Sequence, residues 1–527
     1  MRPYLPRSAA GVAALAAAAV LVTGGIAAPA GAAAAPTGQA SAALTPNPSS
    51  TYNFLQGVNA VSGSDAWAVG SYNDTTTGAS KTLILHWNGT AWSKVKSPSP
   101  GSSFNELHGV SAVSGSDAWA VGDYFNATAR AYDTLILHWN GTAWSKVKSP
   151  NPSPGASYLY GVSAGSGSDA WAVGNYDNNG ISNTLILHWN GTAWSKIESP
   201  AAQNTNFGLD GVSAVSGSDA WAVGNYGING SATFDTVILH WDGTAWSKIS
   251  SPSPGSGANY LYGVSAVSRS DAWAVGSYSS SLNPGAYDTL ILHWNGTAWT
   301  QVKSPRPSST WNFLEGVSAR PGSGAWAVGY YKDDTVGSFD TLILRWNGTA
   351  WSKVKSPNPS CPDYYWSYNY LYGVSARSGS DAWAVGDYGD CNFATGKAAT
   401  LAAHWNGTAW TNVSAILTST SVSSSSNPVT TGRAVTYTAT VAPKGTVAPT
   451  PQGGTVAFYD NGSKISSCSA KPLNSGSATC RVTYASVGSH AIKAHYSGYA
   501  DYAGSTSPTL TETVKTPATT SVPVSPR

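Results

Sequence analysis

The chain has 527 residues, which is too long for one ordinary domain, so two or more domains are expected. Only 10% of the residues are charged, whereas the chain has 23 Trp, 27 Tyr and 56 Gly, a composition typical of turn-rich all-β proteins rather than helical enzymes. The 28 basic and 26 acidic residues nearly cancel and no basic face is visible, so nucleic acid is not an expected partner.

The N-terminus has the features of a secretory signal peptide. Arg2 and Arg7 precede an apolar run over residues 9–28, and small residues that suit cleavage follow. A transmembrane anchor is the alternative, because the run is nearly long enough to span a bilayer. We predict a signal peptide over residues 1–35. Its removal would leave 26 basic and 26 acidic residues, with no membrane span in the mature chain.

A linker over residues 36–50 leads into seven copies of one repeat over residues 51–414. Each copy follows the pattern Gly-Ser-Asp-Ala-Trp-Ala-Val-Gly-x-Tyr and then Leu-Ile-Leu-His-Trp-Asn-Gly-Thr-Ala-Trp, with small exchanges. The aspartate recurs at intervals of 52, 52, 50, 52, 53 and 57 residues, with Gly324 in its place in the sixth copy. A period near 50 residues implies about four strands per copy, and seven such units predict an all-β, seven-bladed β-propeller.

The first repeat illustrates the predicted strands, named A to D. They are expected at Leu55–Val61, Ala66–Tyr72, Thr82–Trp87 and Ala91–Val95. The Asn-Gly pair between strands C and D predicts a type I′ hairpin in every blade, with Asp-Gly in the fourth.

Tryptophan and histidine recur at fixed positions of the repeat. Trp67, Trp87 and Trp92 with their equivalents account for 21 of the 23 Trp, and we expect these rings to pack between blades. The recurring histidines come from different blades, whereas metal ligands must converge to about 2 Å from one ion. We therefore expect structural histidines and no metal or other cofactor. The set is His86, His138, His188, His240, His293 and His404, with Arg345 in the sixth repeat.

Variation among the repeats collects in the B–C loops and the D–A linkers, which lie on one face of an up-and-down blade. This variable face is the predicted binding face. Within strand A, one residue between a constant Leu and a constant Gly differs between repeats, and it should ring the central mouth as a candidate ligand site. The alternative is that this position is merely exposed to solvent and unconstrained. The candidates are Gln56, His108, Tyr160, Asp210, Tyr262, Glu315 and Tyr372.

The seventh repeat adds two predictions on the variable face. Trp366 lies among tyrosines that occur in no other repeat, so it is a further candidate for stacking on a sugar ring. Cys361 lies in the linker that enters this blade and Cys391 in its B–C loop. Both cysteines should therefore lie on the same face, and we predict the disulfide Cys361–Cys391.

The composition changes beyond residue 414, where Trp disappears and Thr, Ser and Val alternate. Strand and hairpin signals occur at residues 434–441 and 454–462. Residues 415–514 resemble the bacterial Ig-like repeats of secreted and surface proteins. The resemblance implies an Ig-like β-sandwich that serves as a spacer, display or adhesion module without catalysis.

Cysteines and composition give two further predictions in this part of the chain. Cys468 and Cys480 lie in strand-like runs joined by a short turn, which predicts the disulfide Cys468–Cys480. The Thr- and Pro-rich residues 515–527 are expected to form a flexible tail.

The repeat is also distantly similar to the Asp-box hairpins of sialidase-type propellers. That family motif is Ser-x-Asp-x-Gly-x-Thr-Trp, whereas this chain has Trp-Asn-Gly-Thr-Ala-Trp with a shorter spacing, so the resemblance covers the turn and not an active site. Sialidase chemistry would need an arginine cluster, and the few arginines occupy unrelated repeat positions. A glycosidase needs two facing carboxylates, for which Asp210 and Glu315 are the candidates across the mouth.

Three functions remain open at this point. The first is a non-enzymatic, extracellular binding or adhesion protein that is secreted or surface-associated and monomeric. Its partner would be a carbohydrate or surface protein, with the Ig-like domain as spacer. The second is a secreted glycoside hydrolase or lyase, which a paired-carboxylate cavity at the mouth would favour. The third is a structural surface protein without a discrete ligand. How the ring of blades closes is also open, because no strand obviously crosses between the first and last blades.

Overall fold

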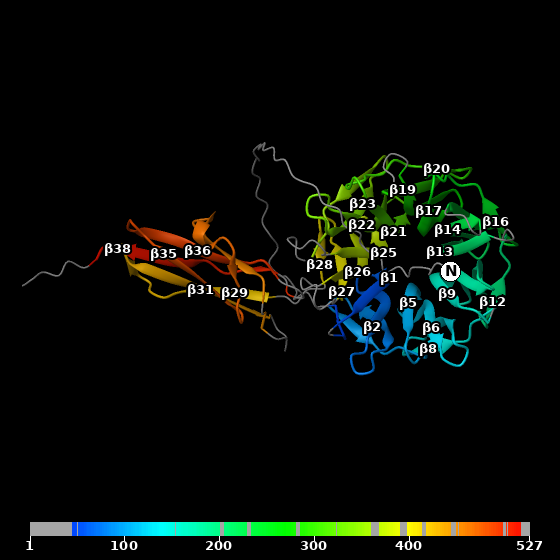
Figure 1. The fold of residues 1–527 in the computed structure, drawn as a ribbon, viewed down its shortest axis with the longest axis horizontal. Helices are drawn as coiled ribbons and strands as arrows, with labels where there is room; N and C mark the ends of the chain where they lie inside the picture. The colour runs from blue at the N-terminus through cyan, green and yellow to red at the C-terminus, as the bar shows by residue number, and fades with distance from the viewer. Residues whose placement is uncertain are drawn as a thin grey trace, which may run out of the picture. The chain divides into compact units, whose positions relative to one another are not determined.

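The protein is all-β. A computed structural model describes residues 45–49, 51–152, 154–200, 205–228, 233–280, 285–322, 324–359, 368–389, 398–413, 418–443, 450–451, 453–498, 502 and 504–517. Within them, seven four-stranded antiparallel sheets precede two sheets of a C-terminal β-sandwich, and one short 3-10 helix occurs, Ser466–Cys468. The seven sheets are arranged around a centre, with their first strands innermost (Figure 1). The predicted seven-bladed propeller followed by an Ig-like sandwich is confirmed.

Each blade is one sheet whose four strands follow chain order, and blade one comprises β1 Asn53–Ser62, β2 Asp65–Asn73, β3 Ser80–Trp87 and β4 Trp92–Val95. The second strand of each blade is buried along most of its length, which explains its continuous Ala-Trp-Ala-Val-Gly run, whereas the fourth is largely exposed. The other blades are β5 Asn105–Ser114, β6 Asp117–Asn126, β7 Ala131–Trp139 and β8 Trp144–Val147; β9 Ser157–Ser166, β10 Asp169–Asn178, β11 Ile181–Trp189 and β12 Trp194–Ile197; β13 Thr205–Ser216, β14 Asp219–Ile228, β15 Asp235–Trp241 and β16 Trp246–Ile249; β17 Asn259–Ser268, β18 Asp271–Ser279, β19 Tyr287–Trp294 and β20 Trp299–Gln301; β21 Asn312–Arg320, β22 Gly324–Lys332, β23 Phe339–Trp346 and β24 Trp351–Val354; and β25 Asn369–Ser378, β26 Asp381–Gly389, β27 Ala398–Trp405 and β28 Trp410–Asn412.

The propeller core lies between neighbouring blades and is built from the repeated tryptophans. Trp67 of blade one is fully buried and packs on Trp139 and Trp144 of blade two, with ring centroids 5.0 and 5.2 Å apart. The same contact closes the circle, because Trp383 of blade seven packs on Trp87 and Trp92 of blade one. Such tilted and edge-on arrangements are the preferred ones for aromatic rings. The repeated tryptophans therefore fill the space between blades, as predicted.

The ring closes without exchanging a strand between the first and last blades. In every blade, an N–H near the end of the first strand donates to a side-chain oxygen of the preceding blade, and the Ala60 N–H donates to Ser375 Oγ across the closure at 3.0 Å. The N-terminal segment occupies the place that a D–A linker would take after blade seven. Asn47 Oδ1 accepts from the Thr400 N–H of blade seven at 2.8 Å. In the same way, Asn151 of the linker after blade two accepts from the Thr134 N–H at 2.9 Å.

The turn between the third and fourth strands differs from its prediction. The connection is a four-residue loop in which only the glycine has a positive φ, +91° at Gly89, whereas a type I′ turn needs two such residues. Asn88 Oδ1 instead accepts from the N–H groups of Thr90 and Ala91 at 3.0 and 2.9 Å. The asparagine side chain thus takes the place of a backbone partner, as in an Asx turn.

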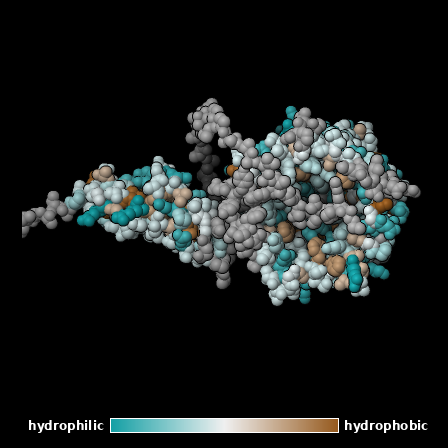
Figure 2. Space-filling model, in the orientation of Figure 1, coloured by the Kyte–Doolittle hydropathy of each residue, from teal (hydrophilic) through white to brown (hydrophobic). Residues whose placement is uncertain are grey.

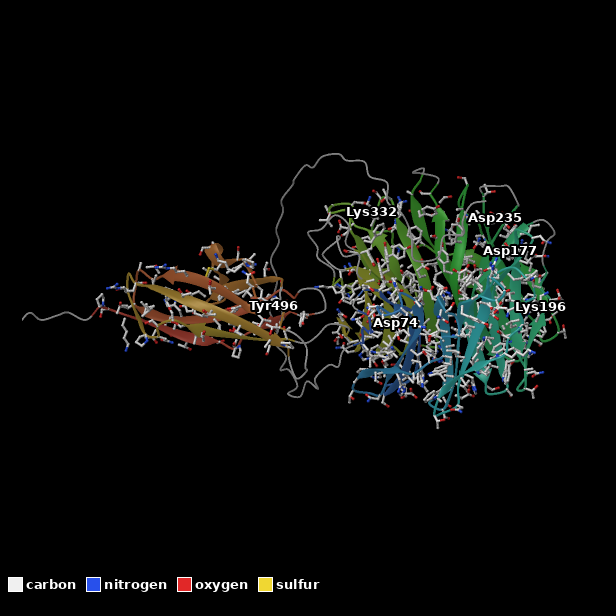
Figure 3. All side chains as sticks on the ribbon, turned by 60° about the horizontal axis from the view of Figure 1, so that its bottom comes forward. Asp74, Asp177, Lys196, Asp235, Lys332 and Tyr496 are labelled. Atoms are coloured by element: carbon white, nitrogen blue, oxygen red, sulfur yellow. A yellow bond between two sulfur atoms is a disulfide. The ribbon has the colours of Figure 1, made fainter. Side chains whose placement is uncertain are left out.

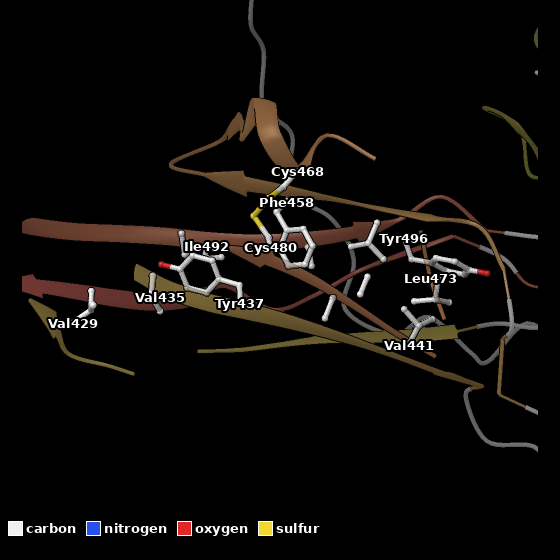
Figure 4. Packing of buried hydrophobic residues seen from close by; sticks show 14 of the residues in the cluster. Val429, Val435, Tyr437, Val441, Phe458, Cys468, Leu473, Cys480, Ile492 and Tyr496 are labelled. Carbon is white, nitrogen blue, oxygen red and sulfur yellow. A yellow bond between two sulfur atoms is a disulfide. The ribbon is translucent and has the colours of Figure 1, made fainter. Parts of the chain in front are cut away.

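The C-terminal sandwich has one sheet in the order β29-β31-β35 and a second in the order β30-β38-β36-β32-β33, with β34 and β37 at its edges. Fully buried Tyr437, Phe458 and Tyr496 dominate the core (Figure 4). The predicted disulfide Cys468–Cys480 is confirmed, although Cys468 lies in the 3-10 helix rather than in a strand. The strands are β29 Thr418–Ser424, β30 Val429–Thr430, β31 Ala434–Pro443, β32 Thr455–Asp460, β33 Ser463–Lys464, β34 Lys471–Pro472, β35 Ser477–Thr483, β36 Gly488–Tyr496, β37 Ser505–Thr506 and β38 Leu510–Lys515.

Several predictions fall outside the described residues and stay predictions. They are the signal peptide, Trp366 and the disulfide Cys361–Cys391. The domain boundaries at residues 35, 50, 414 and 514 are likewise predictions. In the part of the chain that the structure describes, no helix is long and apolar enough to cross a membrane.

Candidate functional site

The variable face is built as predicted. The A–B and C–D turns adjoin each other, since a Cβ on Gly89 would lie 2.7 Å from Ser64 Cβ. The B–C loops and the D–A linkers therefore share the opposite face. Figure 3 labels Asp74, Asp177 and Lys332, which lie where second strands end and B–C loops begin. Described apolar residues with high exposure occur singly, and Figure 2 shows brown only in scattered spots among the described residues of the visible face.

The seven candidate residues form a ring at the inner end of the blades. In each first strand the pairing with the second strand shifts between the Leu and the Gly, so the residue between them is a β-bulge without a partner in the ladder. The following glycine lets the next blade approach: a Cβ on Gly57 would lie 2.8 Å from the His108 carbonyl oxygen. The last such approach, Gly373 to Gln56, closes the ring.

The ring residues are buried or half-buried, so the alternative of an unconstrained, solvent-exposed position does not describe them. Gln56 and Tyr372 are 5% and 7% exposed. Half-buried side chains occupy the other five positions, which are His108, Tyr160, Asp210, Tyr262 and Glu315.

Two of the ring residues contact carboxylates of the mouth. Gln56 Nε2 donates to Glu106 Oε1 at 3.3 Å. His108 Nε2 lies 3.0 Å from Asp123 Oδ1, and the His108 ring lies 5.3 Å from that of Tyr160. Burial raises the pKa of Asp123, and the hydrogen bond with His108 opposes this shift. Blade two thus brings an imidazole and two carboxyl groups to the mouth.

Asp387 of blade seven is a strongly perturbed acid of the mouth. It is 1% exposed, and this burial raises its pKa to about 8. A hydrogen bond from the Tyr372 hydroxyl lowers the pKa, and the charge of Glu106 raises it. Burial therefore favours the neutral, protonated form of Asp387, and the charge of Glu106 acts on it from blade two across blade one.

Asp210 and Glu315, the candidate pair of carboxylates at the mouth, lie on either side of Tyr262 in the ring. Blades four, five and six supply these three residues in turn. Burial raises the pKa of Tyr262, and the charges of Glu315 and Asp210 raise it further. The tyrosine therefore stays a neutral hydroxyl between two acidic neighbours.

The sequence analysis missed a second ring of variable positions, just behind the first. His108 contacts Asp123, and Tyr372 contacts Asp387, because these acids occupy the x of Val-Gly-x-Tyr in the second strand. The signal was present, since x changes between repeats as the first ring does. Glu106 was also missed, although it breaks a position that is aromatic in five repeats. The second ring is Ser71, Asp123, Asn175, Asn225, Ser277, Tyr330 and Asp387.

The recurring histidines form a scaffold away from this mouth. Each is bonded through Nε2 to the repeat aspartate of its own blade at 2.7–2.9 Å, as in His240–Asp219, and stacks on the buried tryptophan. Blade six has lost both partners together: Gly324 replaces the aspartate, and Arg345 lies over Trp326. Among the described residues no group of three or more His, Cys, Asp or Glu side chains could hold a metal ion.

Aromatic residues near the starts of the first strands attach loops to the disc. Tyr132 of blade two contacts Phe104, Phe125 and Tyr158, with centroids 5.4–5.5 Å apart. Tyr370 is near Tyr368 in blade seven, and it contacts blade six rings as well. These rings also form the apolar wall around the polar mouth.

The two rings together are acidic. Their fourteen positions hold four carboxyl groups, Glu106 adds a fifth, and the single basic side chain is His108. Neither ring contains Lys or Arg. Any charge on these rings that His108 does not balance is therefore negative.

Comparison with known proteins identifies the C-terminal part. Residues 420–515 match the bacterial Ig-like domain family, group 3. This region is a bacterial Ig-like domain. No curated protein matches the chain.

Similarities to solved structures are weak and concern overall shape. They include a xyloglucanase from Xanthomonas campestris, 10% identical over 86% of this chain and 79% of that chain, with a TM-score of 0.45. An ulvan lyase is 11% identical over 67% and 91%, with a TM-score of 0.43. The propeller domain of the Trilobed protease from Pyrococcus furiosus is 9% identical over 68% and 94%, with a TM-score of 0.42. At these scores none bears on function, and the propeller rests on its own seven sheets.

Proposed function

We propose that the protein is a non-enzymatic extracellular binding or adhesion protein. Its propeller mouth would engage a carbohydrate or another surface polymer, and the Ig-like domain would act as a spacer. The observation that carries the proposal is the convergence of buried hydrogen-bonding groups, Gln56, His108 and Asp387, inside a wall of tyrosines. Ligand sites combine an apolar wall with a few polar groups in this way.

Extracellular location is supported by two features. The Ig-like domain and the disulfide Cys468–Cys480 are both compatible with an oxidising compartment. The predicted signal peptide would direct the chain there. The mature chain would then meet polymers of its own cell surface or of its surroundings.

A glycan and polysaccharide array probed with the mature chain, residues 36–527, tests the proposal. Saturable binding is expected, with loss in Tyr372→Ala and Trp366→Ala. Tyr176→Ala is the matched control, because it removes the same side chain from beneath Lys196, outside both rings. Absence of binding across the array would leave a structural protein, or one with a protein partner, as the better account.

A glycoside hydrolase or lyase is the second candidate, favoured by one observation. Burial raises the pKa of Asp387 to about 8, Glu106 lies near enough to shift it, and a proton donor paired with a second carboxyl group is what glycosidases require. Release of reducing ends from a bound polysaccharide, abolished in both Asp387→Asn and Glu106→Gln, would establish this function. Binding without such release supports the non-enzymatic proposal.

A further inference from the structure

The mouth sector formed by blades seven, one and two contains buried polar atoms that its own side chains do not satisfy. Gln56 Oε1 and Asp387 Oδ1 are both buried, and neither has a hydrogen-bond partner among the described residues. The Gln56 amide is oriented by its bond to Glu106, so its oxygen belongs to the same sector. Buried polar atoms without partners are rare and unfavourable, and Gln56 Oε1, with Asp387 Oδ1 once that carboxyl group is ionised, requires donors supplied from outside the chain.

The charge of the sector indicates which chemical groups of a ligand could supply those donors. Asp387 and Glu106 are electrostatically coupled, and Asp123 adds a third buried carboxyl group, whose charge the neighbouring His108 can balance. The interactions that shift the pKa of Asp387 include no basic side chain. A ligand that carries both donors and positive charge therefore satisfies the sector better than a neutral hydroxyl group.

A primary ammonium group has these properties, because it offers three N–H donors, no acceptor and one positive charge. The flanking rings indicate what carries it. Tyr370 and Tyr372 lie on one side of the sector and Tyr158 and Tyr160 on the other, with centroids 6.2 and 6.3 Å apart within each pair. Aromatic rings contribute apolar surface to a ligand site, and their π-electrons also favour a nearby cation.

Resting on the proposed function, we infer that the Gln56–Glu106–Asp387 sector binds the ammonium group of an amino sugar within a polysaccharide. The ligand class is therefore a glycan with free, non-acetylated amines. N-acetylation would remove the positive charge and place a carbonyl acceptor against the acceptors of the sector. Polyuronates, sulfated glycans and sialylated glycans would be excluded by the same carboxyl groups.

Calorimetric titration of the mature chain with two matched probes tests this inference. The probes are hexasaccharides of β-1,4-linked glucosamine and of N-acetylglucosamine. Near neutral pH the amine form should bind at least about tenfold more tightly, as expected for hydrogen bonds to a charged group. Gln56→Met and Asp387→Asn should each reduce that preference. Asp177→Asn removes a charge from the same face outside both rings, so it should leave the preference unchanged.

Proton release gives a readout that altered folding would not mimic. An ammonium group at Asp387 Oδ1 favours the ionised carboxylate, so binding should release the proton that the buried carboxyl group holds in the free protein. The binding heat should therefore vary with the ionisation enthalpy of the buffer, and this dependence should decrease in Asp387→Asn. A single cooperative thermal unfolding transition above the temperature of the titration would show that each variant is folded.

The outcomes separate the inference from the proposed function. Equal affinity for both hexasaccharides would overturn the ammonium site while the binding function stands. A lysine hexapeptide that binds in place of both sugars, with loss in the same two variants, would show a basic peptide as the ligand and overturn the sugar class. Array binding confined to neutral or acidic glycans would also refute the inference, and an array without any binding would remove the proposed function itself.

Discussion

The same Asp–His pair occurs in this propeller in two settings. In six blades the histidine of the third strand bonds the aspartate that starts the second strand, and each such histidine stacks on a buried tryptophan. In blade two a further pair, His108–Asp123, lies at the mouth, where other blades have unrelated residues. Identical chemistry thus occurs in the scaffold in one place and at the candidate ligand site in the other. The position within the repeat, rather than the residue type, distinguishes them.

Among the scaffold positions, the glycine of the second strand should be the one whose substitution lowers the free energy of unfolding most. A Cβ on Gly174 would lie 2.0 Å from the Tyr158 carbonyl oxygen, so Gly174→Ala must displace the first strand and its ring residue. We expect a loss of more than about 4 kcal/mol in the free energy of unfolding, or no soluble protein. Thermal unfolding measures this loss.

Gly165→Val is the control for that experiment. Gly165 occupies a position where other repeats have Val, and a Cβ there would meet Asp169 at the ordinary distance of 3.4 Å. Its unfolding temperature should equal that of the wild type. An unaltered Gly174→Ala protein would contradict the close approach of the two strands.

On the mouth side, the largest effect should be on the pH dependence of stability. Burial raises the pKa of Asp387 to about 8 in the folded chain, against about 3.9 in an unfolded one. Between these values the folded state binds more protons than the unfolded state, so the free energy of unfolding falls as the pH rises. Asp387→Asn should remove a fall of a few kcal/mol between about pH 4 and about pH 8.

Unfolding temperatures of wild type and variant across this range provide the measurement. Tyr372→Phe removes the hydrogen bond that lowers the pKa of Asp387, so its stability should keep falling to a higher pH than that of the wild type. A variant Asp387→Asn that loses as much stability with rising pH as the wild type would show that Asp387 is ionised in the folded state.

The two pairs should separate stability from binding when the same substitution is made in each. His188→Gln breaks a scaffold pair of 2.7 Å and a ring contact of 4.2 Å, and it should lower the free energy of unfolding by about 1–3 kcal/mol. Ligand binding should persist. His108→Gln should instead weaken binding and change stability less. If both variants lost stability and retained binding, the mouth pair would be scaffold as well.

The sequence was informative wherever the repeats agree. Constant Trp and Leu positions placed every blade, and length variation identified the face that carries the B–C loops and D–A linkers. Contacts between separate repeat positions were harder to predict. The bulge at Gln56 shifts the pairing of the first strand with the second strand. The variable residue x of Val-Gly-x-Tyr therefore lies behind the ring of first-strand candidates. The C–D turn was predicted wrongly because the Asn88 side chain replaces a backbone hydrogen bond. Ring closure was open because Asn47 and Thr400 lie 353 residues apart.

The smallest expected effect concerns the closure of the ring between blades seven and one. Here, too, one residue type makes the same contacts at two places in the propeller. Asn47 and Asn151 each accept from the N–H and the hydroxyl of a third-strand threonine, Thr400 and Thr134. Replacement of either by Ala should cost about 1 kcal/mol, since the same two hydrogen bonds are lost. Asn151 lies in a linker between two blades, whereas Asn47 precedes the first strand of the first blade. Only Asn47→Ala should therefore make residues 45–52 more sensitive to limited proteolysis, which mass spectrometry of the fragments would detect. Equal resistance of both variants to proteolysis would mean that the ring closes without the N-terminal segment. Closure would then depend on the hydrogen bond from the Ala60 N–H to Ser375 Oγ and on the packing of Trp383 against blade one.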